Sequence, residues 1–585
     1  MANFFREQIT EILPLVNKPV RYIGGEINSV LKSHSLVDVK IALAFPDVYE
    51  IGMSYLGFKI IYEIINSRQD CLAERVYAPW IDMELLLKEK NLPLFTLESY
   101  TPLSEFDIIG FSVQYEMNYT NILQILELGK IPIFAKDRND SDPIVIAGGP
   151  CTSNPEPLAD FIDVFVIGEG EEIINEIIDV YKENKNKTRK EILLALSKLS
   201  GIYVPSFYEV KYNSDGTISS ITPKEENVPL KIEKRIIKDL NTASYPVSQV
   251  VSLTEVIHDR LTIEIMRGCK RACRFCCAGS IYRPVRERNI EEIEKIAIEG
   301  IKNTGYNEIS LSSLCTTDHS QIKEIIERLN TLFAPKYISI SLPSLRVDSF
   351  SVEIASLLQK VRKVGLTFAP EAGTQRMRDV INKNTTEEDL MKTIHTVYSS
   401  GWDLIKLYFM IGLPTEQEED VREISSTVKK AIKIGRSLNV KHPKINVSIS
   451  SFIPKSHTVF QWEAQDKGET LRNKISILRR LLQGDIKWHD VNVSLLEAVF
   501  ARGDRRLGKV LFAAYKLGCR FDSWAEHFKF LNWEKAFEEC KIDPAFYANR
   551  KREYEEILPW DHISYGVSKE GLKKEIEKVY GKTTS

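Results

Sequence analysis

The sequence carries no marked excess of charge, no apolar run of membrane length and no low-complexity tract. Its formal net charge is −3 over 585 residues, so no overall field draws the chain to nucleic acid or anionic lipid. The most apolar stretch, residues 404–413, contains a lysine and is far shorter than the ~20 residues that span a bilayer. The N-terminus shows no basic segment followed by an apolar run, so we expect no signal peptide and a cytoplasmic location.

Cysteine is scarce, but its distribution is uneven. The chain has nine cysteines, and four of them fall within the stretch RGCKRACRFCCAG at residues 267–279. Because thiols stay reduced in the cytoplasm, a dense cluster there indicates a metal or catalytic site rather than a disulfide framework. The remaining cysteines have no partner close by in the sequence, and they are Cys71, Cys151, Cys315, Cys519 and Cys540.

The chain is too long for one hydrophobic core, and its pattern of elements divides it into successive parts. Residues 1–36 form an N-terminal extension, and residues 37–200 alternate β-branched runs with helices, which predicts a doubly wound, Rossmann-like parallel sheet. Residues 201–258 have the turn signals of a hairpin and linker. Residues 259–465 resume the alternation and predict a partial (β/α)6 barrel of the TIM type, while residues 466–585 are helical. The fold class is therefore α/β.

Ligands of both α/β parts are expected at the carboxyl ends of their strands. The expected strands of the first part cover residues 37–46, 106–114, 143–150 and 163–170. Those of the second part cover residues 259–269, 308–314, 337–345, 364–371, 404–412 and 445–454.

The spacing within the cysteine cluster favours three metal ligands. Cys269, Cys273 and Cys276 follow the first strand of the second part as Cys-x3-Cys-x2-Cys. Three thiolates of one loop can hold three irons of a cubic iron–sulfur cluster. A structural zinc site needs four ligands, commonly two CxxC pairs, and no second CxxC exists here, although a zinc-binding scaffold stays an alternative. Adjacent Cys277 diverges from Cys276, which leaves one metal position open.

A Cys-x3-Cys-x-aromatic-Cys loop after the first barrel strand resembles the radical S-adenosylmethionine (SAM) superfamily, with Phe275 as the aromatic residue. The resemblance implies that Cys269, Cys273 and Cys276 ligate a [4Fe–4S] cluster whose fourth iron binds SAM. Reductive cleavage would give a 5′-deoxyadenosyl radical that modifies an unactivated carbon. It also implies a one-electron reductant such as flavodoxin or ferredoxin as a partner.

The resemblance implies further cofactor contacts. Phe275 belongs to the motif itself, and Ser312 and Ser313 stand where the superfamily has glycines that meet the amino group of SAM. Glu371, at a strand end, would bind ribose hydroxyls, although it is also a plausible helix N-terminal acid. Arg376 would pair with the SAM carboxylate or lie on the surface as an ordinary arginine. Gly412 would flank the adenine. Cys315 is a reactive thiol or, in the simpler interpretation, a plain loop cysteine.

The N-terminal part resembles a cobalamin-binding-type domain. The similarity rests on residues 146–172, and it identifies a subgroup of the superfamily that carries such a Rossmann-like domain before the barrel. A lone G-x-G is a weak signal, so a nucleotide-type sheet is the alternative. Because no D-x-H-x-x-G stretch occurs, cobalamin would bind without a histidine ligand, or the domain has lost it. Cobalamin is thus a candidate cofactor, and cobalamin-assisted methyl transfer a candidate reaction.

Other reactions and other residues stay open at this point. Methylthiotransferase-like modification of RNA or protein is the alternative reaction, but it usually needs three more N-terminal cysteines, and only Cys71 and Cys151 are available. Asp561 and His562 could form an acid–base pair or serve structure. Arg502, Arg505 and Arg506 could meet phosphates or form a solvated face. The substrate could be RNA, a peptide or a small metabolite.

Overall fold

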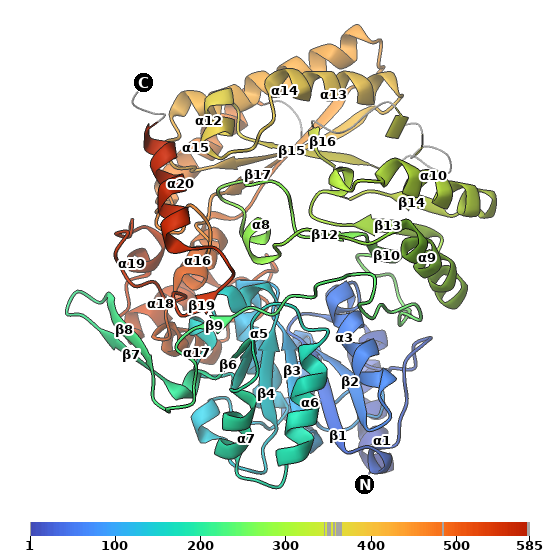
Figure 1. Cartoon of the computed structure of the whole chain (residues 1–585), viewed down its shortest axis with the longest axis vertical. Coiled ribbons are helices and arrows are strands. Elements are labelled where there is room, and N and C mark those ends of the chain that lie inside the picture. The colour runs from blue at the N-terminus through green and yellow to red at the C-terminus, as the bar shows by residue number, and fades with distance from the viewer. Residues whose placement is uncertain are drawn as a thin grey trace.

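A six-stranded sheet forms the centre of the N-terminal part of the chain (Figure 1). The computed structural model describes residues 2–343, 345–347, 353–354, 357, 365–482 and 485–581. The strand order is β2-β1-β3-β4-β5-β6, and neighbours are parallel except for β5 and β6. This order places the topological switch point between β1 and β3. The strands are β1 (Val39–Phe45), β2 (Cys71–Tyr77), β3 (Ile108–Ser112), β4 (Ile144–Gly148), β5 (Val164–Val166) and β6 (Ile202–Tyr203).

Helices cover this sheet, so its strands are buried along nearly their whole length, as parallel strands with two covered faces must be. That burial explains why these strands are apolar runs rather than alternating patterns. The helices are α1 (Ala2–Ile12), α2 (Tyr49–Gly52), α3 (Leu56–Ser67), α4 (Ile81–Glu89), α5 (Tyr119–Leu128), α6 (Ile173–Asn184) and α7 (Arg189–Leu196). We call the unit of these helices and the sheet the sheet domain.

Three short strands link the sheet domain to the next part. β7 and β8 form an antiparallel hairpin, while β9 pairs with β19 from near the C-terminus. The C-terminal segment thus returns to the linker. These strands are β7 (Tyr208–Tyr212), β8 (Ile218–Pro223) and β9 (Ile232–Glu233).

The predicted barrel is present as two groups of parallel strands in sequence order, β10-β13-β14 and β15-β16-β17-β18. Residue 344 of the expected strand 337–345 and residue 364 of the expected strand 364–371 lie outside the described residues. The strands are β10 (Leu261–Glu264), β11 (Met266–Arg267), β12 (Arg286–Glu287), β13 (Glu308–Ser312), β14 (Ser339–Ser341), β15 (Leu366–Glu371), β16 (Leu404–Ile411), β17 (Lys444–Ser451) and β18 (Ile486–Trp488).

The barrel helices have clear start and stop signals. The Asn289 side chain caps the first helix after the cysteines, and Gly305, with φ 71°, ends it in the left-handed conformation. Thr386 and Asp389 form a capping box at the start of the helix over Glu387–Ser399. The helices are α8 (Cys277–Ile281), α9 (Ile290–Thr304), α10 (Ile322–Phe333), α12 (Gln375–Val380), α13 (Glu387–Ser399) and α14 (Glu418–Ser437).

The rest of the chain is mostly helical, as expected, but two short strands interrupt the stretch 466–585. β18 extends the edge of β17, and β19 (Ile563–Ser564) pairs with β9. Both depend on partners distant in sequence, so local periodicity does not reveal them. The helices are α15 (Gly468–Leu481), α16 (Val491–Arg502), α17 (Leu507–Lys516), α18 (Phe530–Cys540), α19 (Pro544–Ala548) and α20 (Lys569–Gly581).

The C-terminal helices seal the switch point of the sheet domain. Asn121, fully buried at the start of α5, donates to the carbonyl of Pro46 and accepts from the backbone N–H of Phe521. The Trp524 indole N–H donates to Asp47, just past the end of β1, at 3.0 Å. The rings of Phe521 and Trp524 both pack against Trp80. The segment between α17 and α18 therefore fills the crevice where doubly wound sheets bind ligands.

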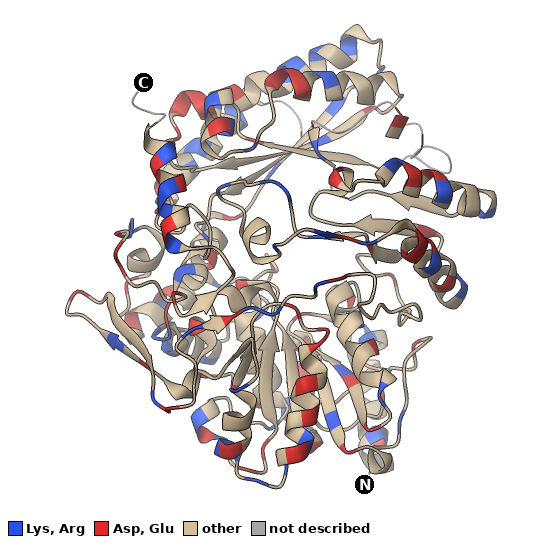
Figure 2. Cartoon of the chain, viewed as in Figure 1, with Lys and Arg blue, Asp and Glu red and all other residues tan. Residues whose placement is uncertain are grey.

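Charge is evenly mixed over the outer elements. Figure 2 shows acidic and basic residues interspersed along α6, α9, α13, α14 and α20, in keeping with the small net charge. The short helix α8 at the centre of the view carries no charge, whereas the neighbouring strand β12 does. Among the described helices, none combines the length and apolarity needed to cross a membrane.

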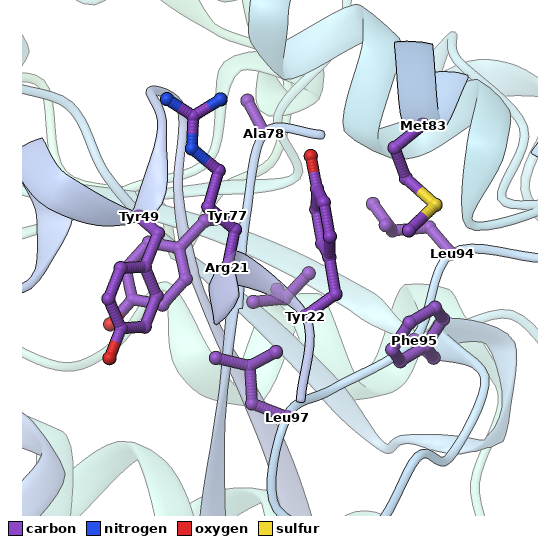
Figure 3. A pocket seen from close by; sticks show the side chains of 10 residues that line it. Arg21, Tyr22, Tyr49, Tyr77, Ala78, Met83, Leu94, Phe95 and Leu97 are labelled. Carbon is purple, nitrogen blue, oxygen red and sulfur yellow. The ribbon is translucent and has the colours of Figure 1, made fainter. Parts of the chain in front are cut away.

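A small closed cavity lies beside the end of β2 (Figure 3). Tyr22, Tyr49, Tyr77 and Phe95 are among the side chains that line it. Its volume, counted as the space open to the centre of a water-sized sphere, is only ≈ 10 Å³, which is room for about one water. The buried Tyr77 hydroxyl has no hydrogen-bond partner among the described residues. The cavity is far too small for a cofactor.

We predict that Asn121→Ala weakens the docking of the C-terminal helices. The change leaves the Pro46 carbonyl and the Phe521 N–H without partners, which costs about 3 kcal/mol of unfolding free energy. Urea unfolding measures the loss, and limited proteolysis should cut faster between α17 and α18. Ser523→Ala, at an exposed neighbouring position, is the control and should cost less than about 0.5 kcal/mol. Wild-type stability of Asn121→Ala would contradict this.

Candidate active site

The four clustered cysteines lie on a loop whose two ends are paired. β11 and β12 form a short antiparallel ladder in which Arg267 faces Arg286, and we call residues 268–285 between them the cysteine loop. Gly268 opens it at φ +85°, and a Cβ there would meet the carbonyls of Tyr282 and Pro284 at 2.7 Å, so only glycine fits. Figure 1 places α8, which this loop contains, at the middle of the view between the two groups of parallel strands.

The thiols of the predicted ligands are half-buried and face hydrogen-bond donors. The backbone N–H of Arg271 donates to Cys269 Sγ at 3.4 Å, and that of Gly279 donates to Cys276 Sγ at 3.3 Å. Burial raises the pKa of Cys273 to about 11 and also raises that of Cys276, while the Lys383 ammonium acts in the opposite direction. A bound metal deprotonates such thiols outright, and N–H donors and a nearby cation suit the resulting thiolates.

The donor set fits an iron–sulfur cluster better than a zinc ion. Within the described residues, no three Cys, His, Asp or Glu side chains are grouped closely enough to hold one metal ion. A cubic cluster has a different requirement, because each thiolate binds a different iron. Three thiols on one loop with N–H donors to sulfur meet that requirement, and they would hold the cluster while one iron faces the open side.

Cys277 points to other neighbours than the three predicted ligands do. Burial raises the pKa of Cys277 to about 12, and besides the adjacent Cys276 the side chains that act on it are Lys455, Glu116 and Ser153. Lys455 follows the end of β17 and pairs with Glu116 at 2.6 Å and Glu497 at 2.9 Å. One charge therefore comes from the sheet domain, one from the barrel and one from the C-terminal helices. The Lys455 side chain is 23% exposed, so solvent reaches it. We call Lys455, Glu116 and Glu497 the polar junction.

Glu371 lies beside the cysteine loop. It ends β15 with φ +68°, an unusual backbone conformation for a non-glycine residue. Its carboxylate forms an ion pair with Lys383 at 2.9 Å. Both side chains act electrostatically on Cys273 and Cys276, which places them near the predicted cluster. The role of Glu371 toward ribose stays a prediction. Lys383 was missed by the sequence analysis, because a lysine twelve residues further along has no local signal.

Ser312 ends β13 and Ser313 follows it, and this strand end is hydrogen-bonded to the segment that leads into the cysteine loop. The backbone N–H of Ile265 donates to the carbonyl of Ser312 at 3.0 Å, and the Ser313 hydroxyl donates to Thr316 at 3.2 Å. Nearby Cys315 is almost fully buried, which raises its pKa to about 12 and favours a plain structural cysteine over a reactive thiol.

The other predicted cofactor contacts have partners within the chain. Arg376 forms an ion pair with Asp420 and is 40% exposed. Gly412 has φ +80°, and a Cβ there would meet Leu471 at 3.0 Å. Phe275 packs partly buried against an apolar cluster that includes Trp462. These contacts explain the residues structurally, and their roles toward SAM stay predictions.

The carboxyl edge of the sheet domain is taken up by other segments of the chain. Besides the filled switch point, a Cβ at Gly149 would meet the Val113 carbonyl at 2.5 Å, and one at Gly168 would meet the Arg235 carbonyl at 2.4 Å. Both glycines are therefore required by contacts within the chain and say nothing of a ligand. The segment between α17 and α18 occupies the switch point, so cobalamin stays a candidate cofactor and we derive no step through it.

The two N-terminal cysteines lie too far apart to share a cluster. Cys71 begins β2, whereas Cys151 follows the end of β4, and the parallel arrangement puts these positions at opposite edges of the sheet. The sheet domain thus lacks the second cluster site that methylthiolation usually needs.

Asp561 and His562 do not form a pair. Asp561 binds Lys569 at 2.8 Å, whereas the His562 ring packs against Tyr203 and Tyr208. Neither of its nitrogens has a hydrogen-bond partner among the described residues. Burial lowers the pKa of His562 to about 4 and outweighs the opposing Glu156 carboxylate. The structural interpretation is therefore favoured.

The expectation for the three arginines of residues 502–506 was wrong in both of its forms. Arg502 is fully buried and donates to the carbonyls of Tyr547 and Ala548. Arg505 pairs with Glu156 at 2.8 Å and Arg506 with Asp504 at 2.7 Å. Each guanidinium finds acceptors through tertiary packing, so these residues form neither a phosphate site nor a solvated face.

Two family models match the sequence. The model described as radical SAM proteins, N-terminal, matches residues 57–205, and the model of the radical SAM superfamily matches residues 263–428. Together they cover more than half of the chain, and the second includes the cysteine loop, Glu371 and Gly412.

Similar proteins were found over most of the chain and over a smaller part of it. An uncharacterised protein of Methanocaldococcus jannaschii is 29% identical over 479 residues, 80% of this chain and 90% of that protein. The ribosomal protein uS12 methylthiotransferase RimO of Thermotoga maritima is 26% identical over 178 residues, 29% of this chain and 41% of that enzyme. The radical SAM methyltransferase TsrM from Kitasatospora setae, solved with cobalamin and a [4Fe–4S] cluster, is 12% identical with a TM-score of 0.51 and covers 86% of this chain and 99% of its own. This last likeness is one of fold.

We predict that Cys277 is dispensable for the cluster. Replacing Cys269, Cys273 or Cys276 with alanine should abolish the iron bound after anaerobic reconstitution, because each thiolate holds a different iron. Cys277→Ala should keep about four irons per chain, since its side chain turns to Lys455 and Ser153 instead. Iron analysis and the visible absorption of the cluster measure both. Loss of iron in Cys277→Ala alone would overturn the ligand assignment.

We further predict that His562 contributes to acid sensitivity. The unfolded ring takes up a proton near pH 6.5 that the buried ring takes up only near pH 4, so the stability present above pH 6.5 is lost as the pH falls between these values. The loss amounts to about 3 kcal/mol. In urea unfolding of the iron-free protein at pH 7, 6 and 5, His562→Phe should show a shallower decline. Exposed His442→Asn is the control and should decline like wild type.

Proposed function

The chain belongs to the radical SAM superfamily, and from this premise we propose that it cleaves SAM reductively and uses the resulting radical on an unactivated carbon of its substrate. When bound, a [4Fe–4S] cluster with SAM supplies a 5′-deoxyadenosyl radical from one external electron. The single observation that carries the proposal is the loop that holds Cys269, Cys273 and Cys276 behind the first barrel strand, with N–H donors to two of the sulfurs.

The residues around the loop support binding of SAM on the open side of the cluster. Glu371 and Lys383, paired and only 14% and 13% exposed, present a carboxylate and an ammonium near the thiols. A carboxylate can accept hydrogen bonds from ribose hydroxyls, and Lys383 holds it in place. Ser312 and Ser313, at the end of β13, would contribute small polar groups beside the amino end of SAM.

The polar junction of Lys455, Glu116 and Glu497 supports a substrate space between the cysteine loop and the sheet domain. It lies at the carboxyl ends of β17 and β3, where α/β proteins place functional residues. Its partial exposure leaves polar atoms for a ligand. A radical formed at the cluster would act close by, because Cys277, beside the ligand Cys276, is within electrostatic reach of Lys455.

Cobalamin-assisted methyl transfer is the second candidate, favoured by the fold of the sheet domain and its likeness to TsrM. The filled switch point argues against it, since a cobalamin would have to use the ends of β3 and β4 instead. Cobalamin content after anaerobic purification separates the two candidates. The substrate class, the cytoplasmic location and the identity of the reductant, flavodoxin or ferredoxin, are further predictions.

The test of the proposal is SAM cleavage by the anaerobically reconstituted chain. With dithionite or reduced flavodoxin, the protein should release 5′-deoxyadenosine, and Cys273→Ala should release none. S-adenosylhomocysteine would add support for methyl transfer. An intact cluster that yields neither product with either reductant would refute the proposal.

We predict that Glu371→Gln weakens SAM binding without loss of iron. The amide removes a charge-assisted contact, which should raise the KM for SAM about 10-fold. Iron content should stay at the wild-type value, because Glu371 is not a ligand. Glu388→Gln, exposed on α13, is the control. An unchanged KM would show that Glu371 serves only its ion pair with Lys383.

A further inference from the structure

The ladder that closes the cysteine loop has an unusual composition. β11 and β12 contribute two residues each, and their pairs are Met266 with Glu287 and Arg267 with Arg286. Two-stranded ribbons are marginal on their own, and like charges directly opposite each other destabilise a ladder. The side chains of Arg267 and Arg286 are only 11% and 7% exposed, so water screens their repulsion poorly. The ladder therefore depends on counter-charges. Within the barrel, Glu264 binds Arg267 with both oxygens at 3.0 and 2.8 Å, and a further counter-charge comes from the sheet domain.

One carboxylate of the sheet domain supplies that counter-charge to both strands. Glu169, in the turn after β5, binds Arg286 with both oxygens at 2.7 Å and reaches Arg267 at 3.3 Å. The backbone N–H of Ile237 also donates to it at 2.6 Å. Its side chain is 8% exposed. Glu171, two residues on, binds Arg267 at 2.5 Å.

We propose that Glu169 is a positioning residue for the iron–sulfur cluster: it holds the two ends of the cysteine loop together and so sets the spacing of the three thiols. Arg267 stands two residues before Cys269, and Arg286 ends the return of the same loop. The inference rests on the proposed function, because it assumes that this loop holds a cluster. Mutation of a residue that orients metal ligands without binding the metal commonly lowers metal affinity by roughly 10- to 100-fold.

The glycine-rich turn thus has a different purpose from the one its sequence suggests. Gly168 and Gly170 resemble a phosphate or cofactor turn, yet the first packs against the backbone of Arg235, and a Cβ at the second would meet Ile61 at 3.1 Å. The acidic residues between and after them face arginines rather than an open site. The turn connects two domains of the chain.

The experiment compares Glu169→Gln with Glu172→Gln. The control residue lies in the same turn, is 59% exposed and pairs only with Arg235 at 3.4 Å. All proteins are reconstituted anaerobically, and iron per chain, the rate of iron loss to a chelator and the EPR spectrum of the reduced cluster with and without SAM are measured. Glu169→Gln should lose iron about 10-fold faster and show an altered spectrum. Glu172→Gln should match wild type.

Two further variants keep the test decisive. Glu169→Asp keeps the charge and should restore part of the iron retention, which a loss of folding alone would not explain. Arg286→Lys keeps the charge but cannot bind both oxygens at once, so it should release iron faster than wild type even if Glu169→Gln does not fold. Wild-type release rates and spectra in Glu169→Gln, or in Arg286→Lys where the former is insoluble, would overturn the inference. Absence of iron from the wild-type chain would instead refute the proposed function.

Discussion

Two buried guanidinium groups that face each other across a two-residue ladder constrain the whole molecule. Arg267 and Arg286 cannot lie side by side out of water without carboxylates beside them. Glu264 of the barrel supplies one to Arg267, whereas Glu169 and Glu171 come from another domain. Breaking a buried pair by removing one partner costs roughly 3–5 kcal/mol, because the remaining charge is left uncompensated. Glu169 of the sheet domain, which pairs with both arginines, therefore helps to keep the cysteine loop of the barrel closed.

Contacts between domains also occupy the carboxyl edge of the sheet, where a ligand would be expected. In doubly wound proteins the carboxyl ends of the strands hold the ligand, because unpaired polar groups collect there. Here those groups are satisfied within the chain. Trp524 binds Asp47 beyond β1, and the Arg235 backbone pairs with the end of β5. Past β4, His457 contacts the carbonyl of Ser153 at 2.9 Å. The edge has become the seam between domains.

Sequence analysis succeeded where the signal is local. The parallel strands of the sheet domain are covered on both faces and are therefore apolar along their length. The assignment of three ligands within eight residues, on a loop behind an apolar run, stays a prediction. Sequence analysis failed where partners are distant. Glu169 and Arg286 are 117 residues apart, Asn121 and Phe521 are 400 apart, and neither pair has a local pattern. Arg502 was expected at a surface for the same reason, since its acceptors are carbonyls of residues 547–550. The strand β18 was missed because only the edge of β17 makes it extended.

The junction of Lys455, Glu116 and Glu497 follows from the same long-range assembly. Glu116 and Lys455 are separated by 339 residues, and the three charges meet only when sheet domain, barrel and C-terminal helices are docked. The lysine of this junction acts on Cys277, at the start of the uncharged helix α8, more strongly than Glu116 does. The polar wall of the space next to the cysteine loop is thus created by docking rather than by any one domain. A radical generated there would be enclosed by all three parts, because Glu169 fixes the loop from one side while Lys455 joins the parts on the other.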